Sequence, residues 1–293
     1  MHKFLKAIGF SSVKTRNQLQ SIISKTLKES EKRSFTTYEE DTLLAEYSLD
    51  FGPNMGITVC GEMDEKDNFI FEYCYPYLKG NCISSQEKSV VERHASNISF
   101  AGVCEDNKIG ISIIYYLQNR MEYIKQTYSH CENTEGTTLS LSGLAIGGTI
   151  MMPLAKNVVS KSKTMSSKKR SQLVEAARNG DENAIETLTL DDLDMYSALS
   201  QKIKETDVYT LVESSFMPYG VECDQYSVLG EITRLEEVTN NLTGELVYQM
   251  TIICNEIPID ICINKEDLYG EPKVGRRFKG AIWLQGFLNF PLS

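Results

Sequence analysis

The chain has 293 residues, of which 41% are hydrophobic and 24% are charged, a composition typical of globular proteins that excludes wholesale disorder. Its formal net charge is −10. Nucleic-acid-binding proteins usually present a net positive surface to the phosphates, so this charge disfavours nucleic acid as a partner. The length is sufficient for more than one domain, because single hydrophobic cores tend to stop growing at roughly 250–300 residues.

Residues 1–160 are predicted to form an antiparallel α+β domain. Apolar residues recur at helical spacing between Arg16 and Glu29, which indicates an amphipathic helix. From Ser34 onward the apolar period changes to two, as in a half-buried strand. Polar turns at residues 64–68 and 105–108 each separate two apolar runs, a pattern typical of β-hairpins. An antiparallel meander with one buried face is therefore expected.

The uncharged run Leu139–Ala155 could suggest a membrane segment. Its 17 residues are short of the ~20 that a membrane-spanning helix needs, and they include three glycines and Pro153. We therefore predict a strand–turn–strand passing through a protein core, and no contact with a membrane.

Residues 161–225 are predicted to be a linker followed by a helical connector. Lys161–Arg170 is rich in lysine and serine and lacks aromatic residues, as exposed linkers do. An apolar stripe at helical spacing follows and ends at Asn179-Gly180, where glycine can adopt the left-handed conformation that stops a helix.

Residues 226–293 are predicted to form a small β-barrel. Four apolar runs are candidate strands, and residues 240–244 join the first two as a hairpin loop: Val228–Leu235, Leu246–Ile253, Ile257–Ile263 and Phe278–Leu288. This number of strands in about sixty-five residues favours a barrel of the oligonucleotide/oligosaccharide-binding type. The predicted fold class of the whole chain is thus α+β, with an N-terminal antiparallel sheet, a helical connector and a C-terminal barrel.

Cysteine usage points to a reducing compartment. The chain has eight cysteines, none of them in a Cys-x-x-Cys pair: Cys60, Cys74, Cys82, Cys104, Cys131, Cys223, Cys254 and Cys262. Structural zinc sites need closely paired thiolates, so we expect no metal, and the N-terminal residues lack the apolar stretch of a secretory signal. We therefore predict a cytoplasmic protein with free thiols.

Four stretches of the sequence resemble an uncharacterised domain-of-unknown-function family of clostridial bacteria. They are MHKFLKAIGFS, LVEAARNGDENAIETLTLDDLDMYSALSQKI, SSFMPYGVECDQYSVLGEI and GEPKVGRRFKGAIWLQGFL. The resemblance covers nearly the full length. It implies a bacterial cytosolic protein, and it supplies no activity, cofactor or catalytic residue.

No catalytic residue is predicted. General acid–base chemistry most often uses histidine, and neither His94 nor His130 lies in a recognisable nucleophile context. The sequence contains no Gly-x-Ser-x-Gly turn and no phosphate-binding loop, so we expect no nucleotide cofactor.

The most informative stretch is residues 273–286, which holds four cations and the single tryptophan of the chain. Strand alternation would place Arg277, Lys279, Trp283 and Gln285 on one side of the strand, together with Ala281. The candidate binding residues are these four polar or aromatic residues and the preceding Arg276. Cations beside an aromatic ring are how small barrels bind nucleic acid or anionic ligands. The alternative, which we favour, is that Phe278, Ile282 and Leu284 fill the barrel while Arg276 and Arg277 pair with carboxylates.

The preferred function is that of a non-catalytic, cytosolic binding or regulatory protein. Its partner would be a protein or a small anionic ligand, bound where the connector meets the barrel. Two alternatives remain open: an enzyme that uses unidentified carboxylates, and single-stranded nucleic-acid binding through the barrel.

Overall fold

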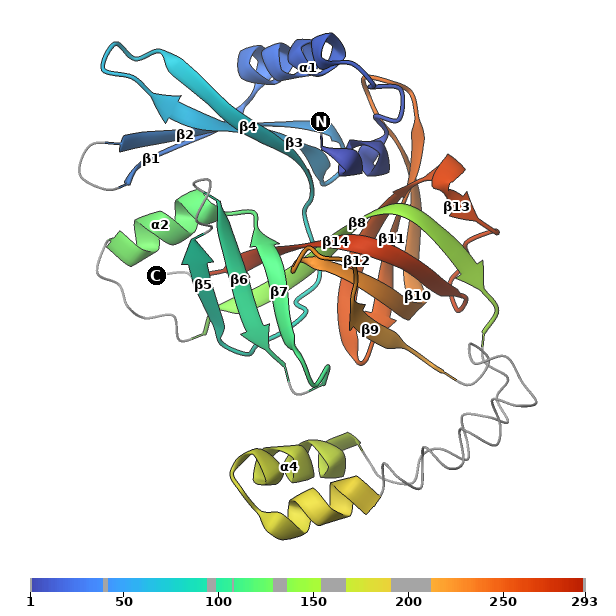
Figure 1. Ribbon diagram of the computed structural model, residues 1–293. Helices are drawn as coiled ribbons and strands as arrows, with labels where there is room; N and C mark the ends of the chain where they lie inside the picture. The colour runs from blue at the N-terminus through green and yellow to red at the C-terminus, as the bar shows by residue number, and fades with distance from the viewer. Residues whose placement is uncertain are drawn as a thin grey trace.

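The computed structural model describes residues 2–38, 42–93, 99–106, 108–128, 136–153, 167–190 and 212–291. Strands predominate in this part of the chain and helices are few, so the fold is α+β with a large share of β-structure (Figure 1). Among the described helices, none combines the length and the apolar character that a membrane crossing would need.

The first sheet, sheet A, is a four-stranded antiparallel meander. Its strands follow one another in space as they do in the sequence: β1 (Lys32–Tyr38), β2 (Thr42–Gly52), β3 (Met55–Met63) and β4 (Phe69–Leu78). The predicted hairpin around residues 64–68 is confirmed as the β3–β4 connection. Helix α1 (Arg16–Glu29) has the predicted bounds and contacts β2 and β3.

The second sheet, sheet B, contains ten strands. They are β5 (Ser89–Arg93), β6 (Phe100–Glu105), β7 (Ser112–Leu117), β8 (Thr138–Met151), β9 (Ser215–Pro218), β10 (Gln225–Thr239), β11 (Leu246–Cys254), β12 (Ile257–Asn264), β13 (Leu268–Tyr269) and β14 (Arg277–Asn289). Helix α2 (Arg120–Tyr128) follows β7. The short helix η3 (Lys265–Asp267) lies between β12 and β13.

Five strands of sheet B pair in a closed ring. β10 pairs with β11, β11 with β12, β12 with β8, β8 with β14, and β14 with β10. Only the β12–β8 pairing in this ring is parallel. The side chains of Phe278, Ile282 and Leu284 belong to one buried core, whereas Trp283 belongs to a second, so β14 packs on both of its faces.

The prediction of a strand–turn–strand at Leu139–Ala155 is wrong for the described residues, because β8 runs unbroken from Thr138 to Met151. Two of the glycines in this run, Gly143 and Gly148, mark close packing instead of a turn. A Cβ atom at Gly148 would overlap the ring of Phe278 on the neighbouring strand. A glycine inside a strand can thus be required by an adjacent aromatic ring.

Strands from both outer parts of the chain share sheet B. β7 and β8, which belong to the predicted segment 1–160, pair with β14 of the predicted segment 226–293. In the sequence, α4 (Ser167–Arg178) and a second helix at residues 182–190 lie between these two segments. Part of the predicted linker, residues 161–166, lies outside the described residues. The division of the chain at residues 160 and 225 therefore stays a prediction.

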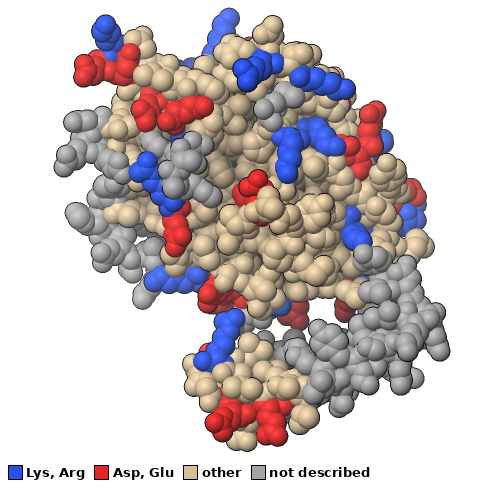
Figure 2. Space-filling view, in the orientation of Figure 1, with Lys and Arg blue, Asp and Glu red and all other residues tan. Residues whose placement is uncertain are grey.

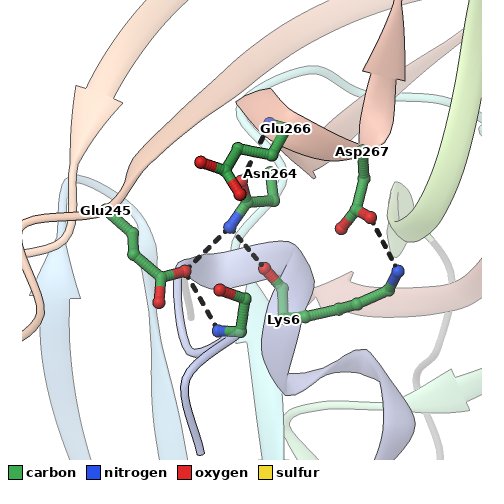
Figure 3. A network of polar contacts seen from close by, with 6 residues as sticks. Lys6, Glu245, Asn264, Glu266 and Asp267 are labelled. Carbon is green, nitrogen blue, oxygen red and sulfur yellow. Dashed lines mark hydrogen bonds and ion pairs between the residues drawn. The ribbon is translucent and has the colours of Figure 1, made fainter.

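The N-terminal segment is bound to the ring by polar contacts (Figure 3). Its short helix η1 (Lys3–Ile8) ends at Gly9, which has a φ of 85°. The Lys6 ammonium lies 2.9 Å from Asp267, and Asn264 Nδ2 donates to Glu245 at 2.8 Å. Ser11 N donates to the same carboxylate at 3.0 Å. These contacts fix the position of the first residues of the chain, which matters for the site described next.

Candidate functional site

A hollow of about 510 Å³, here called the aromatic pocket, lies where the N-terminal segment, β4, β7 and β14 meet. Six of its lining residues carry rings: His2, Phe4, Tyr73, Tyr75, Tyr116 and Trp283. The others are Lys3, Cys74, Ser99, Glu222, Asp224 and Gln225. A hollow of this size and character is typical of small-molecule sites, which are mostly apolar with a few placed polar groups.

The rings form a continuous chain of contacts. The Trp283 ring lies 4.5 Å from His2, 5.6 Å from Phe4 and 5.2 Å from Tyr116, measured between ring centroids. Tyr116 in turn lies 4.7 Å from Tyr75. Aromatic pairs at such separations attract one another beyond the area they bury, so the wall of the pocket is held in one arrangement.

Hydrogen bonds orient the polar residues of the pocket. Trp283 Nε1 donates to Asp224 Oδ2 at 2.6 Å, and Lys3 Nζ donates to Gln225 Oε1 at 3.0 Å. Burial lowers the pKa of His2 to about 4, so its imidazole is neutral at neutral pH. The lining also contains one basic and two acidic residues, Lys3, Glu222 and Asp224.

A buried ion pair lies behind the tyrosines. Arg120, at the start of α2, donates from Nε to Glu46 Oε1 on β2, and both side chains are almost fully buried. The Arg120 guanidinium also lies 5.5 Å from the centroid of the Tyr73 ring. Burial raises the pKa of Tyr73, so its hydroxyl stays protonated. The Tyr116 hydroxyl donates to the Tyr73 hydroxyl at 3.5 Å. The ion pair thus joins sheet A to α2 and supports one wall of the pocket.

The five predicted binding residues do not form one exposed stripe. Arg277 is buried and donates to two backbone carbonyls, and Gln285 is fully buried and donates to the carbonyl of Pro76. Arg276 lies just before β14 and donates to the carbonyl of Glu271, while Lys279 is half-buried on β14. Trp283 alone among them lines the aromatic pocket.

For residues 273–286 we favoured the interpretation that Phe278, Ile282 and Leu284 are buried while Arg276 and Arg277 pair with carboxylates. The burial is confirmed. Phe278, Ile282 and Leu284 lie in the buried core, as expected. Arg276 lies 3.6 Å from the carboxylate of Glu271, and Arg277 donates to the backbone carbonyls of Met152 and Val212. A role of these five residues in binding stays a prediction.

Sequence reasoning missed most of the pocket because its residues come from distant parts of the chain. His2 lies just before η1 and Phe4 within it, Tyr73 and Tyr75 lie on β4, and Tyr116 lies on β7. Two tyrosines two residues apart on a strand share one face, and this alternation is the local signal that could have found them.

A group of residues that could hold a metal ion is absent from the described part of the chain. His94 and His130, weighed above as general bases, lie outside the described residues. The aromatic pocket therefore offers rings for stacking, hydrogen-bonding groups and charged side chains, all of which can bind a ligand.

Comparison with known proteins gives a family. The model described as "Domain of unknown function, E. rectale Gene description (DUF3881)" matches residues 5–286. The chain belongs to this family. The match covers nearly the full length and confirms the resemblance found in the sequence, and DUF3881 carries no assigned activity. No curated protein matches the chain, and no solved structure does.

The thiols give a first testable prediction. Four cysteines of the described strands are buried, and burial raises the pKa of each thiol: Cys60, Cys104, Cys254 and Cys262. Because the thiolate is the reactive form and burial also keeps the reagent away, these four should react slowly with a thiol reagent in the native protein. Cys223 should react faster than they do because it is exposed, although desolvation and the nearby Asp224 raise its pKa as well.

In denaturant all eight thiols should react without prior reduction. Spectrophotometric thiol titration measures both numbers. A shortfall in denaturant, in protein prepared without oxygen, would contradict the prediction of free thiols, and stoichiometric zinc in an elemental analysis would contradict the prediction of no metal.

Proposed function

We propose that the protein is a non-catalytic, cytoplasmic protein that binds a small molecule in the aromatic pocket. The observation that carries this proposal is the pocket itself. Its volume of about 510 Å³ is within the range of roughly 300–1,000 Å³ that small-molecule sites occupy, and rings make up half of its lining residues.

The construction of the pocket supports binding without large rearrangement. Phe4, Tyr75, Tyr116 and Trp283 are buried, and their rings contact one another. The N-terminal segment that carries His2 is fixed to the ring by the polar contacts of Figure 3. A preorganised site of this kind loses little conformational entropy when a ligand binds.

The environment of the thiols supports the cytoplasmic part of the proposal. Cys254 donates to the carbonyl of Ser215 at 3.1 Å, and Cys262 donates to the carbonyl of Ala7 at 3.2 Å. Both therefore act as protonated side chains inside the packed structure, a use of cysteine that suits a reducing compartment.

We also propose that the five-stranded ring is of the oligonucleotide/oligosaccharide-binding type. In that fold three antiparallel strands form a meander, the third pairs in parallel with the fifth, and the fourth pairs with the fifth and the first. Here β10, β11 and β12 form the meander, β8 is parallel to β12, and β14 pairs with β8 and β10. This pairing fits such a fold with its last strand placed first in the chain.

The same comparison disfavours nucleic-acid binding through the ring. Ligands of that fold bind across its second and third strands, which correspond to β11 and β12. Gln249 on β11 donates to the carbonyl of Pro53, and Cys262 on β12 donates to the carbonyl of Ala7, so sheet A and the N-terminal segment already cover these strands. Figure 2 shows Lys and Arg interspersed with Asp and Glu on the face in view, without one broad basic surface there.

The single tryptophan makes the proposal testable. Trp283 lines the pocket, so its fluorescence reports on this site alone. A library of small metabolites, added one compound at a time, should contain members that change the Trp283 emission with saturation. A Ser99→Phe variant, which places a ring in the pocket, should weaken their binding at least tenfold, because a filled site has no room for the ligand.

Ser112→Phe is the matched control, because Ser112 is exposed on β7 and does not line the pocket. It should bind the same compounds as the wild type does. If no compound changes the emission, or if both variants bind equally well, the pocket is not a binding site and the proposal is wrong.

A further inference from the structure

We propose that the His2 side chain is a movable cover of the aromatic pocket, which a ligand displaces in order to stack on Trp283. The inference rests on the proposed function and adds how the site opens. Trp283 lines the pocket, yet it is only 5% exposed, so a ligand in the hollow can reach little of its ring. A neighbouring ring has to move before the tryptophan can take part in binding.

His2 is the neighbour of Trp283 that is best placed to move. Its ring centroid lies 4.5 Å from that of Trp283, nearer than Phe4 at 5.6 Å or Tyr116 at 5.2 Å. Phe4 and Tyr116 are buried members of a hydrophobic core, whereas His2 is half-buried at the start of the described chain. Displacement of His2 would therefore expose Trp283 without opening the core.

The His2 imidazole is held weakly in the closed position. Its ring contacts those of Trp283 and Phe4, and aromatic contacts of this kind are attractive. Its Nδ1 atom, however, is buried without a hydrogen-bond partner among the described residues, so closing costs the imidazole part of its hydration. The same burial lowers the pKa of His2 to about 4. The two effects oppose each other and are of similar size, so the open and closed positions are close in free energy.

The rest of the N-terminal segment is anchored beyond His2. The Lys6 ammonium lies 2.9 Å from Asp267, and the carbonyl of Ala7 accepts a hydrogen bond from Cys262 at 3.2 Å. The described contacts of the His2 side chain are the two ring contacts. A rotation about the backbone of residues 2 and 3 would therefore move the imidazole away and leave these anchors in place.

The alternative is that His2 is a fixed wall of the pocket, which a ligand touches without moving it. The two roles predict opposite results when the ring is removed. Loss of a cover tightens binding, because no closed population has to be displaced. Loss of a wall removes contacts with the ligand and weakens binding.

The first experiment measures the cover without any ligand. The Stern–Volmer constant for acrylamide quenching of Trp283 fluorescence should rise at least about twofold in His2→Ala, because the tryptophan loses the ring nearest to it. His2→Phe, which keeps a ring at this position, should be quenched as the wild type is. Phe35→Ala is the matched control, because it removes a ring on β1 that is 40% exposed and does not line the pocket.

The second experiment uses benzyl alcohol, a small uncharged molecule with one ring, as the probe. Titration followed by Trp283 emission should give about fivefold tighter binding to His2→Ala than to the wild type, because the place beside the tryptophan is already vacant. Binding to His2→Phe should be about fivefold weaker than to the wild type, because a phenyl ring has no buried nitrogen to return to water and stays closed. Phe35→Ala should bind the probe as the wild type does.

Unchanged quenching in His2→Ala would overturn the inference, as would equal or weaker binding of benzyl alcohol to that variant, or its failure to bind at all. The proposed function would survive each of these results if metabolites still bind the wild type and not Ser99→Phe. If instead no metabolite binds the wild type, the proposed function fails, and the quenching and the benzyl alcohol titration still decide the role of His2.

Discussion

Replacing Glu46 by glutamine should lower the free energy of unfolding by about 3–5 kcal/mol, because it removes the buried carboxylate to which the buried Arg120 guanidinium donates. Both side chains are nearly inaccessible to solvent, at 9% and 1% exposure, so water cannot replace the lost carboxylate. Cys60, which donates to the same oxygen at 3.7 Å, would lose its charged acceptor as well. Urea unfolding followed by circular dichroism measures the change.

Glu29→Gln provides the matched control for this measurement. Glu29 pairs with Lys25 one helical turn away on the exposed surface of α1, and its loss should cost less than about 0.5 kcal/mol. A double variant, Glu46→Leu/Arg120→Met, should be more stable than Glu46→Gln alone, because it removes both buried charges. Equal, small effects of Glu46→Gln and Glu29→Gln would contradict the interpretation of a solvent-excluded ion pair.

The second large effect is expected for Arg277→Ala/Lys279→Ala, which should lower the free energy of unfolding by about 2–4 kcal/mol. Arg277 is 5% exposed and donates from Nε to the carbonyl of Met152 at 3.0 Å and from Nη1 to the carbonyl of Val212 at 2.6 Å. One guanidinium therefore holds together the end of β8 and the segment that leads into β9. Its removal frees both segments at once.

Lys279→Ala alone should cost less than about 1 kcal/mol, because Lys279 is only half-buried. Thermal melts of the single and double variants separate the two contributions. Titration with a single-stranded oligonucleotide, run beside them, should find no salt-sensitive binding in the wild type. Oligonucleotide binding that the double variant loses without any change in melting temperature would support the nucleic-acid alternative instead.

Local patterns were sufficient to predict most of the strands and α1. The α1 bounds follow from the spacing of its apolar residues, and the β3–β4 hairpin follows from a polar turn between two apolar runs. Failure came at β8, where three glycines were interpreted as a turn. For Gly148 the requirement is set by Phe278, 130 residues away, and a local window cannot contain that information.

The same limit applies to the site. Trp283 was singled out because it is the only tryptophan, and it lies in the pocket. Its neighbours there, Phe4 and Tyr116, are brought close by ring and sheet pairings that no local pattern specifies. Arg277 and Lys279 lie on the same strand as Trp283, but burial and contacts with backbone carbonyls decide the role of Arg277.

The pairing of β14 has a consequence for the order of events during synthesis. Among the strands that the structure describes, β14 is the last to leave the ribosome, and it pairs with β7, β8 and β10. Each strand of sheet A pairs only with strands next to it in the sequence, so this sheet can form early. In contrast, β12 and β14, the two long partners of β8, both lie within residues 257–293. Contacts so distant in sequence form slowly. The apolar side chains of β8 thus lack their strand partners while the chain is being made, and a chaperone would protect this strand until β14 has emerged.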